Sequence, residues 1–135
     1  MFYSFQIAIP ANTTQNDAIE TDIKLTQGVI YNVQVQFPIG CKELAHCQIY
    51  REGSQKWPTN PEANLASDGY IIPISEEIEL LSAPYTFKAK TWNEDDTYDH
   101  TITIWIGVLR GRSWQRMAQI FEALARFMSK FGVQV

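Results

Sequence analysis

The stretch Val29-Ile30-Tyr31-Asn32-Val33-Gln34-Val35-Gln36-Phe37 decides the fold class. Its odd positions are apolar, while Asn32, Gln34 and Gln36 fall between them and face the other way. A period of two residues is typical of a β-strand with one face in a core and the other in water. This segment is therefore predicted to be a half-buried strand.

The same alternation recurs on both sides of this strand. Further candidate strands cover residues 5–9, 19–25, 44–52, 69–74, 77–81, 85–92 and 101–108. Turn-forming clusters separate them, among them Pro38-Ile39-Gly40, Glu52-Gly53-Ser54, a long loop over 58–69, and Asn93-Glu94-Asp95-Asp96. About eight short strands with no helix between them predict an all-β domain over residues 1–109, an antiparallel β-sandwich of jelly-roll or Ig-like type.

The period changes in residues 110–135. The spacings alternate between three and four along Trp114, Met117, Phe121, Leu124, Met128 and Phe131, and Ile120 and Phe127 widen this apolar seam. Ser113 is a good N-cap and Gly132 a plausible stop. The segment is predicted to be a strongly amphipathic C-terminal α-helix of about five turns, used for docking or oligomerisation.

Composition bounds the function classes. With 135 residues, of which 45% are hydrophobic and 13% aromatic, the chain suits one globular core and is no disordered polyampholyte. The net charge of -4 divides into about -8 over 1–109 and +4 over 110–135. An acidic body disfavours nucleic acid as a partner, because the backbone phosphates would be repelled.

No motif in the chain points to catalysis. The only histidines, His46 and His100, are far apart, and the chain holds neither a nucleophile elbow nor a phosphate-binding loop. Carboxylate pairs could be drawn from Glu76, Glu77, Glu79 and the acidic loop, but no spacing favours them. We predict no enzyme and no cofactor. An enzyme would instead require a cleft with two facing carboxylates.

Two parts of the sequence contain side chains that can bind metal ions. Asp95, Asp96 and Asp99 could give oxygen ligands to calcium, yet adjacent carboxylates are typical of a solvated hairpin tip, so we expect no metal there. Cys41 and Cys47 are expected to be reduced and partly buried, since the chain shows no secretory signal. The histidines do not stand at zinc-ligand spacing from these cysteines.

Exposed aromatic rings on a sandwich can bind sugars. Trp57, Tyr70 and Trp92 are the candidate platform of the alternative function, a carbohydrate- or receptor-binding module, and it requires these rings to be exposed and coplanar. Trp57 in its loop could instead plug one end of the sandwich, which is the reading we favour.

The chain shows no sign of membrane insertion. The N-terminus alternates apolar and polar residues without a basic region, so it reads as a strand rather than a signal peptide. No apolar run approaches 18 residues. The basic helix could lie on an anionic membrane surface, but its heptad spacing favours contact with protein.

Two segments together resemble a known group of proteins. They are Trp57-Pro58-Thr59-Asn60-Pro61-Glu62-Ala63-Asn64-Leu65-Ala66-Ser67-Asp68-Gly69-Tyr70 and Trp92-Asn93-Glu94-Asp95-Asp96-Thr97-Tyr98-Asp99-His100-Thr101-Ile102-Thr103. The pair resembles small uncharacterised phage-like and environmental proteins, over roughly residues 5–109. The resemblance implies a viral structural setting, such as a minor capsid, decoration or tail-associated protein, and carries no activity. The C-terminal helix departs from that pattern.

The expected function follows from the helix. An apolar seam of eight large side chains needs a cover, either the sandwich of its own chain or another protein. We predict that other subunits cover it, with Phe121 and Leu124 central, in a homo-oligomer or with other capsid proteins. The chain is thus expected to be a non-enzymatic assembly protein of the virion or of its cytoplasmic assembly site.

Overall fold

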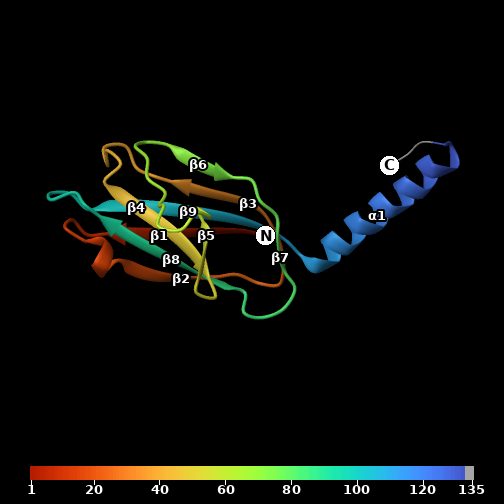
Figure 1. Cartoon of the computed structure of the whole chain (residues 1–135), viewed down its shortest axis with the longest axis horizontal. Coiled ribbons are helices and arrows are strands. Elements are labelled where there is room, and N and C mark those ends of the chain that lie inside the picture. Colours follow the sequence, from red (N-terminus) through yellow and green to blue (C-terminus); the bar gives the residue numbers. More distant parts are fainter. Residues whose placement is uncertain (133–135) are drawn as a thin grey trace.

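The computed structural model describes residues 1–132, and for residues 111–117 it describes the course of the backbone alone. Two antiparallel sheets face each other, and a single long helix leads away from one end of them (Figure 1). The predicted all-β fold of antiparallel strands with a C-terminal helix is confirmed, in a sandwich-like arrangement of two sheets with nine strands over residues 1–132 rather than about eight.

The strands divide between the sheets as follows. Sheet A has the order β1 (Phe2–Ile9), β9 (His100–Leu109), β3 (Gly28–Gln36) and β6 (Ile71–Ile74), and β7 (Ile78–Leu80) also pairs with β3. Sheet B has the order β2 (Ile19–Lys24), β8 (Thr86–Asn93), β4 (Ala45–Arg51) and β5 (Ser54–Trp57). A short 3-10 helix, η1 (Gln15–Asp17), precedes β2.

The pairings are nested. The hairpin β4–β5 lies innermost in sequence, and around it β3 pairs with β6 and β7, β2 with β8, and β1 with β9. The chain therefore forms one long antiparallel ribbon, which is wound so that β9 also pairs with β3, and β8 with β4. The nested pairing puts the first strand of the sandwich, β1, beside the last, β9.

The core lies between the inner faces of the two sheets. Cross-strand register places Phe5, Ile104 and Val35 in one row and Ile7 beside Ile102, all on the inner side. The prediction for the two clearest strands is confirmed, because Val33, Val35, Ile102, Ile104 and Ile106 are fully buried. Period-two alternation therefore gave the correct facing of β3 and β9.

The outer faces of the two sheets differ in charge. On sheet B, the exposed positions of β2 and β8 carry Glu20, Asp22, Lys88 and Lys90. On sheet A, the outward-facing residues of β1, β9 and β3 include no charged residue: they include Phe2, Ser4, Gln6 and Ala8, then Thr101, Thr103, Trp105, Gly107 and Leu109, then Tyr31, Asn32, Gln34 and Gln36. One face is thus ionic and the other neutral.

Two details differ from the sequence-based expectation, and a third agrees with it. Strand β5 lies outside every predicted strand. Its four residues stop just before Pro58 and are too few to show an alternating pattern. The helix α1 (Gly111–Lys130) begins two residues before the expected N-cap Ser113, and Arg110 occupies the N-cap position. The expected stop is confirmed, because Gly132 has a φ of 76° and its N–H bonds to the carbonyl of Ser129.

Candidate functional site

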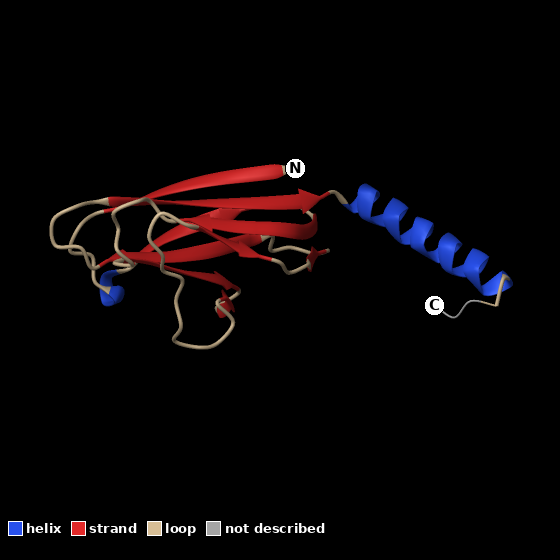
Figure 2. Cartoon of the chain, turned by 90° about the horizontal axis from the view of Figure 1, so that it is seen from above, coloured by secondary structure: helices blue, strands red, loops and turns tan. Residues whose placement is uncertain are grey.

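The helix α1 is the part of the chain with the least contact to the sandwich. It follows β9 after the single residue Arg110, contacts β3 at its root and then projects into open space (Figure 2). Its 20 residues form no packed layer on either sheet. Helices in proteins gain most of their stability from packing an amphipathic face rather than from helix propensity.

The apolar seam of the helix is open to solvent where its side chains are described. Ile120, Phe121, Leu124, Phe127 and Phe131 are 50–70% exposed, and Met128 is half-buried. Trp114 and Met117, the first two residues of the predicted seam, lie outside the described side chains. Phe127 and Phe131 contact each other with ring centroids 4.9 Å apart. The seam is therefore contiguous, and no part of the described sandwich covers these five side chains.

The opposite side of the helix is polar and basic. Arg126 and Lys130 are exposed there, together with Gln119 and the single acidic residue Glu122. The body of the chain is acidic, so the helix has a charge opposite to that of any sandwich it approaches. The helix and the body of the chain therefore carry charges of opposite sign.

The predicted ring platform is wrong. Trp57 and Trp92 are only 3% and 1% exposed, whereas Tyr70 is 58% exposed. Trp57 stacks on Phe87 with ring centroids 5.5 Å apart, and its indole N–H donates to a Glu76 carboxylate oxygen at 2.7 Å. The expected burial of Trp57 is therefore confirmed, but it is a core residue of β5 opposite Ile49 rather than a loop residue that closes one end of the sandwich, and its ring is unavailable to a sugar.

Trp92 is buried for a different reason. Alternation along β8 places it on the outer side of sheet B, where a sugar platform would need it. The ring of His46, its neighbour on β4, stacks on it at 5.1 Å, and η1 packs against β8. The His46 ring and the segment between β1 and β2 therefore shield the indole of Trp92 from solvent.

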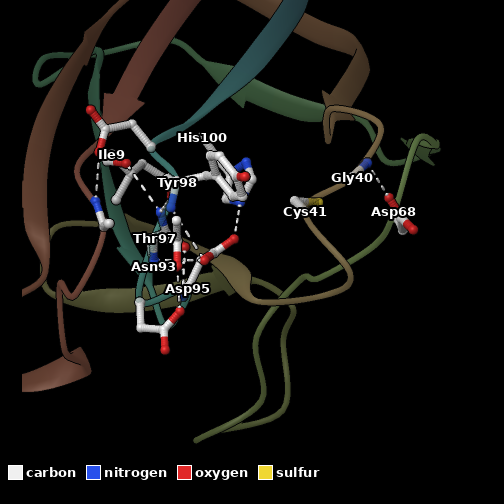
Figure 3. A network of polar contacts seen from close by, with 12 residues as sticks. Ile9, Gly40, Cys41, Asp68, Asn93, Asp95, Thr97, Tyr98 and His100 are labelled. Atoms are coloured by element: carbon white, nitrogen blue, oxygen red, sulfur yellow. Dashed lines mark hydrogen bonds and ion pairs between the residues drawn. The ribbon is translucent and has the colours of Figure 1, made fainter.

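The acidic loop is organised by its own backbone (Figure 3). Asp95 accepts hydrogen bonds from the N–H groups of Thr97 and Tyr98 at 2.9 and 3.3 Å, and its other oxygen lies 2.8 Å from His100 Nε2. The bond from Thr97, followed by that from His100, holds the pKa of Asp95 below its ordinary value.

The other two calcium candidates also have protein partners. Asp99 accepts the N–H of Ala11 at 2.8 Å, and Asp96 accepts the hydroxyl of Thr97 at 2.8 Å. Within residues 1–132, no group of three or more potential ligand side chains could hold a metal ion. The carboxylates of Asp95, Asp96 and Asp99 each order a different part of this end of the sandwich.

One important residue of this network was missed from the sequence. Asn93 is fully buried, and its amide donates to the carbonyls of Ile9 and Tyr98 at 3.2 and 2.9 Å while its oxygen accepts the N–H of Asp95 at 3.0 Å. It thus joins β1 to the turn between β8 and β9. The only signal in the sequence was its place as the first residue of a turn cluster.

The thiols and imidazoles are arranged for structure. Cys41 and Cys47 are free and buried, as expected, and burial raises the pKa of Cys47 to about 12. Burial also raises the pKa of Cys41, whose thiol donates to the carbonyl of Ser67 at 2.8 Å. His46 is adjacent to Cys47 in β4 but lies on the opposite face of the sheet, so the two cannot act as a nucleophile and base.

An open groove of about 420 Å³ lies on the outer face of sheet B. Its carboxylate Glu20 lies 3.5 Å from Lys88 and 3.7 Å from Lys90, and the Lys90 ammonium also lies 4.5 Å from the centre of the Tyr50 ring. The carboxylates suggested by the sequence lie elsewhere, since Glu76 is bonded to Trp57. Two further carboxylates, those of Asp22 and Glu52, also line the groove, and only Glu20 forms ion pairs there.

Comparison with known proteins adds no identity to this geometry. No protein-family model matches the chain, and no curated protein matches it either. Over residues 1–132, no helix is both long and apolar enough to cross a membrane. Two features of the structure bear on function, the nested pairing of the strands and the uncovered helix.

Proposed function

We propose that this chain is a non-enzymatic assembly protein whose helix α1 docks onto other subunits. The observation that carries the proposal is the open seam of Ile120, Phe121, Leu124, Phe127 and Phe131. Soluble monomers rarely expose a contiguous apolar patch of this size, and such patches mark sites of protein contact. Full burial would contribute about 1.5–3 kcal/mol for each of these side chains.

We further propose that the sandwich is a jelly-roll and that the assembly is a virus-like particle. The nested pairing of β1 with β9, β2 with β8 and β3 with β6 supports this, because winding such a ribbon into two sheets produces a jelly-roll. Jelly-rolls serve as capsid and lectin domains. The burial of Trp57 and Trp92 favours the capsid role, as a capsid-associated or decoration-type component of the virion, over glycan binding.

The partner is another copy of this chain or another protein of the particle. The opposite charges of the basic helix and the acidic body support contact between copies. The helix stands clear of its own sandwich, which leaves the seam accessible to a neighbour (Figure 2). The protein would then occur in the virion or where the virion is assembled in the cytoplasm.

The seam variant, Phe121→Asp with Leu124→Asp, tests this function. Light scattering after size-exclusion chromatography should show a smaller assembly than that of the native chain, because two buried carboxylates are too costly at an apolar interface. Circular dichroism should show the sandwich still folded, since both side chains are exposed in the single chain.

A matched control keeps the charge change but moves it off the seam. Gln119→Asp with Ala123→Asp alters exposed residues on the side of the helix away from the seam and should assemble like the native chain. Equal masses for the native chain and the seam variant would disprove docking through the helix.

A further inference from the structure

The edges of the two sheets are protected unequally. Unpaired edge strands invite pairing with other chains, and proteins block them with charges, proline, bulges or short length. Edge strand β2 carries Glu20, Asp22 and Lys24, and β5 has only four residues. The edge formed by β6 and β7 contains Pro73 and Glu79. Three of the four edges are thus blocked.

Strand β1 has none of these features. Its eight residues Phe2-Tyr3-Ser4-Phe5-Gln6-Ile7-Ala8-Ile9 contain neither a charge nor a proline, and they pair with β9 without a bulge. Figure 2 shows this strand, which begins next to the label N, along the outer side of the sandwich. Sheet A therefore ends in a long, regular and neutral edge.

The free backbone groups of β1 can be assigned. Met1 and Val108 exchange both of their backbone hydrogen bonds, at 2.6 and 2.7 Å. In an antiparallel pair such bonded positions alternate, so the odd residues of β1 bond to β9. The N–H and C=O groups of Phe2, Ser4, Gln6 and Ala8 consequently point away from β9, toward the open edge.

The inner side of this edge is also incomplete. Tyr3 and Phe5 point toward the core, where their rings stack with centroids 6.1 Å apart, yet both remain half-exposed. Ile7 and Ile9, further along the same strand, are buried. An added strand beyond β1 would cover the two rings.

We propose that two copies of this chain pair antiparallel along β1, so that sheet A continues from one copy into the other. A second copy fits because the edge is self-complementary about a two-fold axis and has no charge to repel its own kind. The remainder of the body is acidic, so a neutral edge next to the neutral outer face of sheet A is where two bodies meet with least repulsion.

The register is set if the outward-pointing backbone groups of all four residues, Phe2, Ser4, Gln6 and Ala8, form hydrogen bonds with the other copy. Phe2 then faces Ala8 of the other copy, Ser4 faces Gln6, and Phe5 faces Phe5 on the axis. This pairing forms about eight hydrogen bonds between the chains. It also places the two half-exposed Phe5 rings directly opposite each other in a non-hydrogen-bonded pair. Side chains lie closest at such positions, and aromatic pairs there stabilise the sheet.

The first test uses the full chain carrying the seam variant, so that the helix no longer contributes. Light scattering should give twice the 15.5 kDa of one chain. Adding Gln6→Pro should give a monomer, because proline removes an N–H that points outward while every bond to β9 remains. The matched control Gln6→Ala keeps that N–H and should stay a dimer. A monomeric seam variant, or a dimer that survives Gln6→Pro, overturns the proposal.

The second test reads the register without relying on the proline variant. Phe5→Cys should form a disulfide-linked dimer under mild oxidation, since the two Cα atoms of such a facing pair lie within disulfide range. Ser4→Cys faces Gln6 and should not link. Native Cys41 and Cys47 are buried and do not interfere. Linking through Ser4→Cys, or none through Phe5→Cys, overturns the pairing proposed here.

The two proposals fail separately. A native chain that assembles while its seam variant is monomeric would support docking through α1 and disprove pairing through β1. Equal dimers of the native chain and the seam variant, both lost with Gln6→Pro, would support pairing through β1 and disprove docking through α1.

Discussion

At the scale of single residues, Ile104 shows how the sandwich is held together. It is fully buried on β9, in one row with Phe5 and Val35. We predict that Ile104→Ala lowers the free energy of unfolding by about 2–5 kcal/mol, through lost burial and the cavity left behind. Thr101→Ala, on the exposed face of the same strand, should change it by less than about 0.5 kcal/mol. Urea denaturation measures both, and a similar small effect at Ile104 would mean that the strand faces the other way.

Asp95 makes stability depend on pH. Its pKa is held below the ordinary value, first by the hydrogen bond from Thr97 and then by that from His100. A carboxylate of this kind stabilises the fold fully above its unfolded pKa, and this contribution is lost as pH falls through the lower folded pKa. We predict that Asp95→Asn destabilises the protein at pH 7 and that the difference from the native chain shrinks below about pH 4.

Denaturation of both proteins across this pH range measures the effect. Asp96→Asn, which removes a neighbouring carboxylate bonded only to the adjacent hydroxyl of Thr97, is the matched control for the substitution itself. A destabilisation by Asp95→Asn that is independent of pH would contradict the assigned role of the charge.

Cys47 should be chemically silent in the folded chain. Because burial raises its pKa to about 12, the thiol stays protonated at pH 8, and the thiolate is the reactive form. We predict that a thiol reagent such as DTNB labels neither native cysteine until denaturant is added, while an added surface thiol, Ser54→Cys, reacts at once. Rapid labelling of the native chain would contradict the burial of these two thiols.

At the scale of elements, the β4–β5 hairpin contains a correctable strain. Its turn residues Glu52 and Gly53 both have positive φ, 51° and 79°, between the paired residues Arg51 and Ser54. Two-residue turns of this kind favour Asn followed by Gly. We predict that Glu52→Asn raises the free energy of unfolding by roughly 0.5–1 kcal/mol.

The control for this hairpin separates backbone strain from charge. Glu52→Gln removes the same negative charge but lacks the preference of asparagine for positive φ, so it should give little of the gain. Thermal denaturation of the three proteins compares them directly. Equal stabilisation by both substitutions would assign the effect to charge.

The elements differ in how well the burial of their side chains could be predicted from the sequence. Alternation in Val33–Val35 and in Ile102–Ile106 predicted which side chains are buried, because period two is a property of the strand itself. Trp92 escaped prediction, since its burial depends on His46 and η1, which approach from elsewhere in the chain. The seam of α1 was predicted by spacing, but spacing alone could not say that the sandwich leaves it open.

At the scale of the whole molecule, the order of the strands was beyond the reach of the sequence. Alternation states which face of a strand is buried and not which strand lies beside it. Nothing in Phe5 or Ile104 as residues shows that β1 lies next to β9. The two interaction surfaces proposed here depend on that order, because it leaves β1 at an edge and directs α1 away from the sheets.

The nested pairing also governs when the sandwich can form. The register of β1 joins Phe2 to Gly107, so this contact closes almost the full length of the sandwich sequence. Proteins with such a high contact order fold in milliseconds to seconds rather than microseconds. During synthesis, β1 emerges before β9 and lacks its partner strand until β9 follows. For that interval a neutral, proline-free strand is open to other nascent chains, and closure by β9 leaves only one of its two edges free.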